Sequence, residues 1–160
     1  MSENYFEIFE IPCEYEINLQ DLEQKYLKIA TILHPDNFEN QDEIFAASSK
    51  FLELNNAYDV LKNANSRAKY LLELQGFVFE GVGKNINVDR DFLEIAMNLA
   101  EGLSSTKSDE KYAEIINIRS TKTAEMTRYF KEKKFQSAAV RHLQIIYLDG
   151  IMKHNFYNKG

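Results

Sequence analysis

The chain has 160 residues, a formal net charge of −6, and a composition that is 44% hydrophobic and 28% charged. This is the mix of a folded globular protein, and it excludes a collagen-like chain or one disordered over most of its length. The acidic balance argues against a non-specific nucleic-acid binder, which needs clustered lysine and arginine. No apolar run approaches the roughly 20 residues that span a membrane.

The single cysteine and the N-terminus bear on the compartment. Because Cys13 is alone, the chain can form no internal disulfide and no metal site with two cysteine ligands. A lone thiol fits a reducing environment. The polar, acidic N-terminus has neither the basic nor the apolar region of a signal peptide. We therefore expect a cytoplasmic protein that spans no membrane and binds no nucleic acid.

The first half of the chain begins with two predicted helices. A short aromatic helix from Tyr5 to Glu10 stops ahead of Pro12, because the residue before a proline is pushed out of the helical region. Asn18 is a good N-cap for a second helix, which Pro35 ends. The apolar residues of the second helix recur at spacings of three and four and so share one face: Leu19, Leu22, Tyr26, Ile29 and Leu33.

Two further helices complete this half. The third has a similar apolar stripe, which suits antiparallel packing against the second helix. Its members are Ile44, Ala47, Phe51, Leu54, Tyr58 and Leu61. A fourth, short helix is capped by Asn65 or Ser66 and ends at Leu74, before Gly76.

The second half predicts a helical bundle. Residues 76–87 contain three of the six glycines and form the predicted linker. Three periodic stretches follow, roughly Asp89–Ser104, Ser108–Lys133 and Gln136–Asn155, separated by short turns. The predicted fold is therefore all-α. An antiparallel helical hairpin with short helices forms an N-terminal domain over residues 1–75, and a three-helix bundle forms a C-terminal domain over residues 88–160.

A short motif, His34-Pro35-Asp36, lies at the break between the second and third helices. On composition alone it is an ordinary turn, because proline stops a helix and aspartate fills a loop. Its placement favours a second interpretation. An amphipathic helix with KYLKIA at residues 25–30 precedes the motif, and a longer helix with NNAYDVL at residues 55–61 follows it. Together these segments resemble a J-domain, the module of DnaJ-type co-chaperones.

A second segment, RAKYLLELQGF at residues 67–77, indicates which group of J-domain proteins the chain resembles. They are similar to the segment that closes the J-domain in HscB-type proteins, the specialised co-chaperones of iron–sulfur cluster biogenesis. The resemblance implies a bacterial-type co-chaperone without a cofactor. Such a protein binds an IscU-type scaffold, delivers it to an HscA/DnaK-class chaperone and stimulates that chaperone's ATP hydrolysis. The alternative is a general J-domain co-chaperone that delivers other client proteins to DnaK.

The resemblance implies a chaperone-binding site at and before the turn. The residues are His34, Pro35, Asp36, Lys25, Lys28 and Tyr26. A proline-fixed turn is presented with little ordering cost, and Asp36 can form a charge-assisted bond with an arginine. Lys25 and Lys28 either steer the chain towards an acidic patch or form a solvated face. The chain departs from the pattern at Leu27 and Ile32, where many J-domains have basic residues.

The helix predicted from Asp89 carries two apolar stripes. The first suits core packing: Phe92, Ile95, Ala96, Leu99 and Leu103. The second is formed by Leu93, Met97 and Ala100, and it either widens the core stripe or forms a binding face bordered by carboxylates. The resemblance favours the binding face. It implies that the scaffold contacts Leu93, Glu94, Met97, Asn98 and Glu101, together with Tyr147 on the last helix.

An enzyme is the less favoured class. His34 and Asp36 could form an acid–base pair, but no nucleophile neighbours them and a solvent-facing turn offers little desolvation. His142 and His154 are 12 residues apart, unlike a helical metal-binding pair, and we expect both at the surface or at a boundary. Cys13 alone cannot supply the four thiolates that usually hold an iron–sulfur cluster. We therefore expect no catalytic residues and no metal site.

Overall fold

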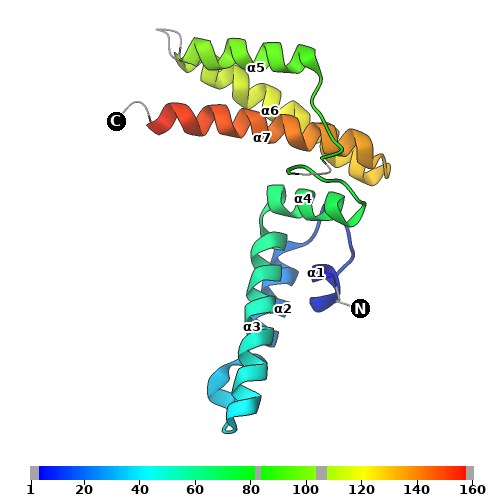
Figure 1. The fold of residues 1–160 in the computed structure, drawn as a ribbon, viewed down its shortest axis with the longest axis vertical. Helices are drawn as coiled ribbons and strands as arrows, with labels where there is room; N and C mark the ends of the chain where they lie inside the picture. Colours follow the sequence, from blue (N-terminus) through cyan, green and yellow to red (C-terminus); the bar gives the residue numbers. More distant parts are fainter. Residues whose placement is uncertain (1–3, 82–83, 104–107, 158–160) are drawn as a thin grey trace. The chain divides into compact units, whose positions relative to one another are not determined.

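The computed structural model describes residues 4–81, 84–103 and 108–157. The chain divides into two compact units, Met1–Leu71 and Leu72–Gly160. Every regular element within the described residues is helical, which confirms the predicted all-α fold (Figure 1). None of the described helices is long and apolar enough to cross a membrane.

The first unit is a helical hairpin with two shorter helices. α2 (Leu19–Leu33) and α3 (Gln41–Lys62) lie side by side and antiparallel, joined through a 3-10 turn, η1 (Pro35–Asn37) (Figure 1). α1 (Tyr5–Ile8) packs against α3, and α4 (Ala64–Leu74) follows it. The buried apolar side chains of the unit are Phe6, Phe9, Tyr15, Leu22, Ala47, Leu54, Ala57, Leu61, Ala68 and Leu71.

Asparagine side chains set where several of these helices begin. Asn18 caps α2 through its side-chain oxygen, as predicted. The predicted cap of α4 at Asn65 or Ser66 is wrong, because Asn63 takes that place. Its backbone is extended, and its Oδ1 lies 3.0 Å from the backbone nitrogens of Asn65 and Ser66, which donate to it. α1 ends at Ile8, two residues earlier than predicted, a difference within the usual uncertainty of helix ends.

Arg67 connects α4 to the rest of the first unit. Its Nε donates to the carbonyl oxygen of Tyr15 at 2.7 Å, and its Nη1 donates to that of Leu61. Burial lowers the pKa of the guanidinium, and these two bonds offset part of the desolvation. Three residues later, Tyr70 stacks on Tyr5 with ring centroids 4.4 Å apart. Two α4 residues from the segment that resembles HscB, Arg67 and Tyr70, therefore hold Tyr15 and Tyr5 of the N-terminal region against α4.

The second unit is a three-helix bundle of α5 (Arg90–Leu103), α6 (Ser108–Lys131) and α7 (Phe135–Tyr157) (Figure 1). α5 packs against both of the longer helices. The core between them is formed by Phe92, Ala96, Leu99, Leu103, Ile115 and Leu148. Ile95, which the sequence placed in this core stripe, is 46% exposed. It lies at the edge of the stripe, and the neighbouring helices do not cover it.

The segment before α5 contributes to the same unit. Phe79 and Ile86, in the stretch predicted as a linker, are both buried. Phe79 meets the ring of His142 edge-on, with ring centroids 5.3 Å apart. His142 is buried, so the prediction of a surface or boundary position is wrong. The side chain of His154 lies outside the described residues.

Candidate functional site

The histidine–proline–aspartate motif lies at the tip of the α2–α3 hairpin. α2 ends at Leu33, and His34 leaves the helix with φ −59° and ψ 129°. The side chains of His34 and Asp36 are 54% and 88% exposed. His34 Nδ1 lies 3.4 Å from the backbone nitrogen of Asp36 and 3.5 Å from its Oδ2. The turn therefore presents an imidazole and a carboxylate together to solvent.

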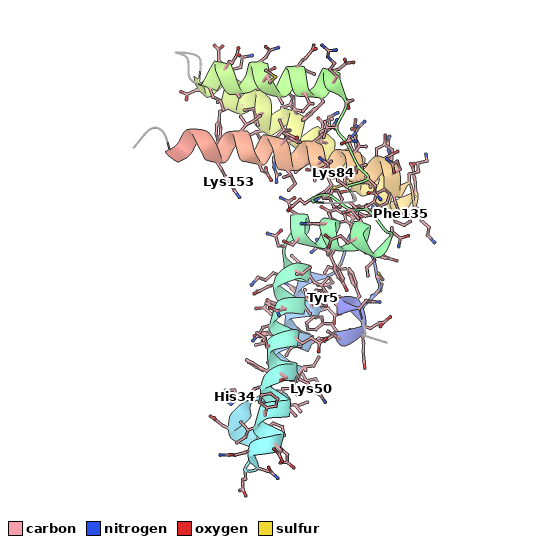
Figure 2. All side chains as sticks on the ribbon, viewed as in Figure 1. Tyr5, His34, Lys50, Lys84, Phe135 and Lys153 are labelled. Carbon is pink, nitrogen blue, oxygen red and sulfur yellow. The ribbon has the colours of Figure 1, made fainter. Side chains whose placement is uncertain are left out.

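Two residues that the sequence did not single out as functional hold this turn in place. The ring of Phe51, on α3, meets the His34 ring edge-on, and Figure 2 shows His34 beside α3. Asn37 closes the end of α2, where proline interrupts the helix, because its Nδ2 donates to the carbonyl oxygen of Thr31 at 2.7 Å. The Phe51 contact depends on the packing of α3 against α2, whereas the Asn37 bond is local, and a polar residue just after the motif could have suggested it.

The other predicted chaperone-binding residues differ in how accessible they are. Tyr26 is half-buried: it stacks on Tyr58 with ring centroids 4.2 Å apart and donates to Asn55 at 2.9 Å. Tyr26 therefore packs between α2 and α3, and only part of its side chain is accessible. Lys25 is held within the unit, whereas Lys28 is exposed and has no ion-pair partner among the described residues.

The predicted scaffold-binding residues of α5 share one face. At 100° per residue they occupy an arc of about 140° on the side away from the core. Met97 is 64% exposed, and Leu93 is half-buried at the edge of the core. The polar members Glu94, Asn98 and Glu101 are all exposed. The arc therefore has one exposed large apolar side chain, that of Met97, and the carboxylates of Glu94 and Glu101 border it.

Two further observations concern this surface. Glu94 Oε1 lies 3.4 Å from Arg90 Nε, one helical turn before it, so one of the carboxylates is shared with a cation. Tyr147 is 43% exposed, but it belongs to α7. The α5 residues are therefore brought together by a single helix, while Tyr147 comes from a second helix of the same unit.

Comparisons with known proteins identify the family. Residues 4–70 match the DnaJ domain. The co-chaperone protein HscB homolog of Aliivibrio salmonicida is 32% identical over 155 residues, which cover 89% of this chain and 90% of that protein. The chain belongs to the HscB family of J-domain co-chaperones. The HscB homolog of Colwellia psychrerythraea is 26% identical over 98% of this chain and 91% of its own length.

Two solved HscB structures have the same fold. Chaperone HscB from Vibrio cholerae superposes with a TM-score of 0.78 at 22% identity, covering 98% of both chains. The human co-chaperone HscB superposes with a TM-score of 0.83 at 24% identity, covering 99% of this chain and 83% of that one. Membership in the HscB family confirms the predicted co-chaperone role in iron–sulfur cluster assembly. A J-domain co-chaperone implies a partner of the DnaK class.

Proposed function

We propose that this HscB-type chain binds an IscU-type scaffold through α5 and Tyr147 and delivers it to an HscA/DnaK-class chaperone. The turn of His34, Pro35 and Asp36 then stimulates the chaperone's ATP hydrolysis. The chain itself catalyses no reaction, and it acts in the bacterial cytoplasm. The observation that carries the scaffold part is the exposure of Met97, which makes the second stripe of α5 available to a partner.

Exposure and rigidity support the chaperone side of the proposal. The carboxylate of Asp36 is open to solvent, so an arginine of the chaperone can reach it and form a charge-assisted hydrogen bond. The contacts of Phe51 with His34 and of Asn37 with the end of α2 restrict the turn before docking. A restricted turn loses less conformational freedom on binding, and so more of the contact energy goes into affinity.

The chemistry of the α5 face supports the scaffold side. A methionine side chain adapts its shape to an apolar partner, and Leu93 beside it offers a half-buried anchor. Glu94 and Glu101 border this apolar centre and favour a partner with basic residues around an apolar patch. The other reading of the stripe, that it only widens the core, does not fit a side chain as exposed as that of Met97.

The geometry gives little support to catalysis by the chain. His34 and Asp36 lie in solvent, where an acid–base pair gains nothing from desolvation. At Cys13, partial desolvation and then the carboxylates of Glu7 and Glu14 raise the pKa of the thiol, which disfavours the thiolate that metals and electrophiles need. No group of three metal-binding side chains occurs in the part of the chain that the structure describes.

The experiment measures ATP hydrolysis by purified HscA-type chaperone and by DnaK, each with the full chain and with or without an IscU-type scaffold. We expect the chain to stimulate the HscA-type chaperone, and we expect the scaffold to increase that stimulation. If the chain stimulates both chaperones equally and the scaffold does not change the stimulation, the result would instead favour a general J-domain co-chaperone. A chain that binds no scaffold in a pull-down would contradict the proposal directly.

A further inference from the structure

Two large aliphatic side chains next to the turn are exposed. Leu27 is 55% exposed and Ile32 is 61% exposed, and both lie on α2. They come seven and two residues before His34, so both lie within about 10 Å of the turn along the helix. Lys28 lies between them around the helix circumference. We call Leu27, Lys28 and Ile32 the α2 flank.

The charges on α2 itself almost cancel. Lys25, the other lysine of α2, donates to the carbonyl oxygen of Glu10 at 3.0 Å and lies 3.2 Å from a carboxylate oxygen of Asp21. Its charge is therefore balanced within the unit. The remaining exposed charges on α2 are one lysine, Lys28, and one glutamate, Glu23. Since the whole chain carries −6, its long-range field does not attract an acidic partner.

We propose that the chaperone docks on the α2 flank chiefly through apolar contacts, and that its docking is therefore only weakly sensitive to salt. This inference rests on the proposed function, in which the adjacent turn engages a DnaK-class chaperone. The flank is continuous with that turn, so a partner that reaches His34 also covers Ile32. The chaperone that fits this chain carries an apolar patch beside the site that receives Asp36, and a chaperone with a purely acidic docking face is a poor partner.

The first measurement is the concentration of full chain that half-saturates stimulation of the DnaK-class chaperone from the same organism. Raising salt from about 0.01 to about 0.15 M shortens the Debye length from about 30 to about 8 Å. We expect the half-saturating concentration to change by less than about threefold, whereas electrostatic steering alters association rates by about 10- to 1,000-fold. A steep rise with salt would overturn the inference.

The second measurement uses variants at the flank. The double variant Leu27→Ser, Ile32→Ser should raise the half-saturating concentration at least about tenfold. Its helix content and the maximal stimulation that it reaches should both stay as in the wild type. Leu19→Ser is the matched control: Leu19 is a half-exposed leucine at the far end of the same helix, about 22 Å from the turn, and its loss should have no effect. The double variant Leu27→Lys, Ile32→Lys should dock as poorly as the serine variant, and docking as tight as that of the wild type would overturn the inference.

The variants also separate this inference from the proposed function. If the serine variant docks like the wild type while His34→Gln fails to stimulate, the chaperone uses the turn but not the flank, and only the inference falls. If the wild type gives no stimulation at all, the proposed function fails and the inference fails with it. If the serine variant loses scaffold binding, the scaffold covers the flank. If the wild type sediments as a dimer and the serine variant does not, a second copy of the chain covers it. Either result also overturns the inference.

Discussion

The rings of His34 and Phe51 meet edge to face, with centroids 6.4 Å apart and planes inclined at 79°. One ring belongs to the turn after α2, and the other belongs to α3, which packs against α2. The contact fixes where the imidazole points without burying it. The orientation of the motif therefore depends on α3 as well as on the proline within the motif.

Replacing Phe51 by alanine should weaken stimulation of the chaperone. An aromatic pair contributes about 0.5–1.5 kcal/mol beyond its buried area, so the half-saturating concentration should rise about 2- to 12-fold. Phe51→Tyr keeps the ring and should stay near the wild type. Leu52→Ala is the control, because the next side chain on α3 is exposed. If Phe51→Ala and Leu52→Ala stimulate equally well, the edge contact does not orient the motif.

Replacing His34 by glutamine should abolish stimulation and leave the fold intact. The side chain is more than half exposed and α2 has ended before it, so helix content by circular dichroism should not change. Glutamine keeps a polar group but not the ring that meets Phe51. ATP hydrolysis by the chaperone is the measurement, with scaffold binding as a second readout that should not move. Normal stimulation by His34→Gln would refute the role of the turn.

Local sequence signals predicted much of this fold because they act over a few residues. The N-cap at Asn18 depends only on residues next to it in the sequence, and the apolar stripes that contain Leu22 and Leu54 depend only on spacing within their own helices. The structure has the cap, and both leucines are buried, as expected. Periodicity identifies an apolar face but not how far the neighbouring helix reaches over it. That is why Ile95 was placed in the core and is exposed.

The buried position of His142 shows the same limit from the opposite side. α7 has buried residues around most of its circumference, so a single polar residue there gives no sign of which side is outward. The partner ring, Phe79, comes from the segment before α5, far away in sequence. Phe51 was likewise predicted only as a core residue. Its contact with His34 requires the hairpin to be closed, and no spacing rule contains that information.

Truncating Leu93 and Met97 to alanine together should weaken scaffold binding. Each truncation of an interface anchor costs about 1–2 kcal/mol, and the pair corresponds to about 30- to 800-fold in affinity if the effects add. Ile95→Ala is the matched control, since Ile95 is also exposed on α5 but lies on the other side of the core stripe. Isothermal titration with the scaffold is the measurement. A fall in melting temperature with unchanged affinity would show that the pair serves the core.

Replacing Arg67 by alanine should destabilise the first unit. The change leaves the buried carbonyls of Tyr15 and Leu61 without their donors, at a cost of about 1–3 kcal/mol each. Denaturant unfolding should therefore show a loss of about 2–6 kcal/mol if the two costs add. Lys50→Ala, at an exposed position of α3, should change stability by less than about 0.5 kcal/mol. Equal stability of the two variants would mean that water replaces the guanidinium.

The ion pair between Glu125 on α6 and Arg141 on α7 should make the second unit sensitive to acid. Burial acts to raise the pKa of Glu125, but Arg141 and Lys122 outweigh it, and the pKa lies below its ordinary value. A carboxyl whose pKa is lowered on folding contributes stability above its unfolded pKa, about 4.3, and loses that contribution as the pH falls through its folded pKa. Glu125→Gln should therefore be less stable than the wild type at pH 7, by about 1–2 kcal/mol for a partly buried pair.

The difference between the wild type and Glu125→Gln should shrink as the pH falls below about 4 and the wild-type carboxyl takes up its proton. Urea unfolding followed at several pH values measures it. Glu114→Gln is the control, because Glu114 pairs with Lys111 at the surface of α6, where an ion pair contributes at most about 1 kcal/mol. A Glu125→Gln difference that stays constant from pH 7 to pH 3 would mean that the side chain stabilises the bundle by packing, since packing does not depend on its charge.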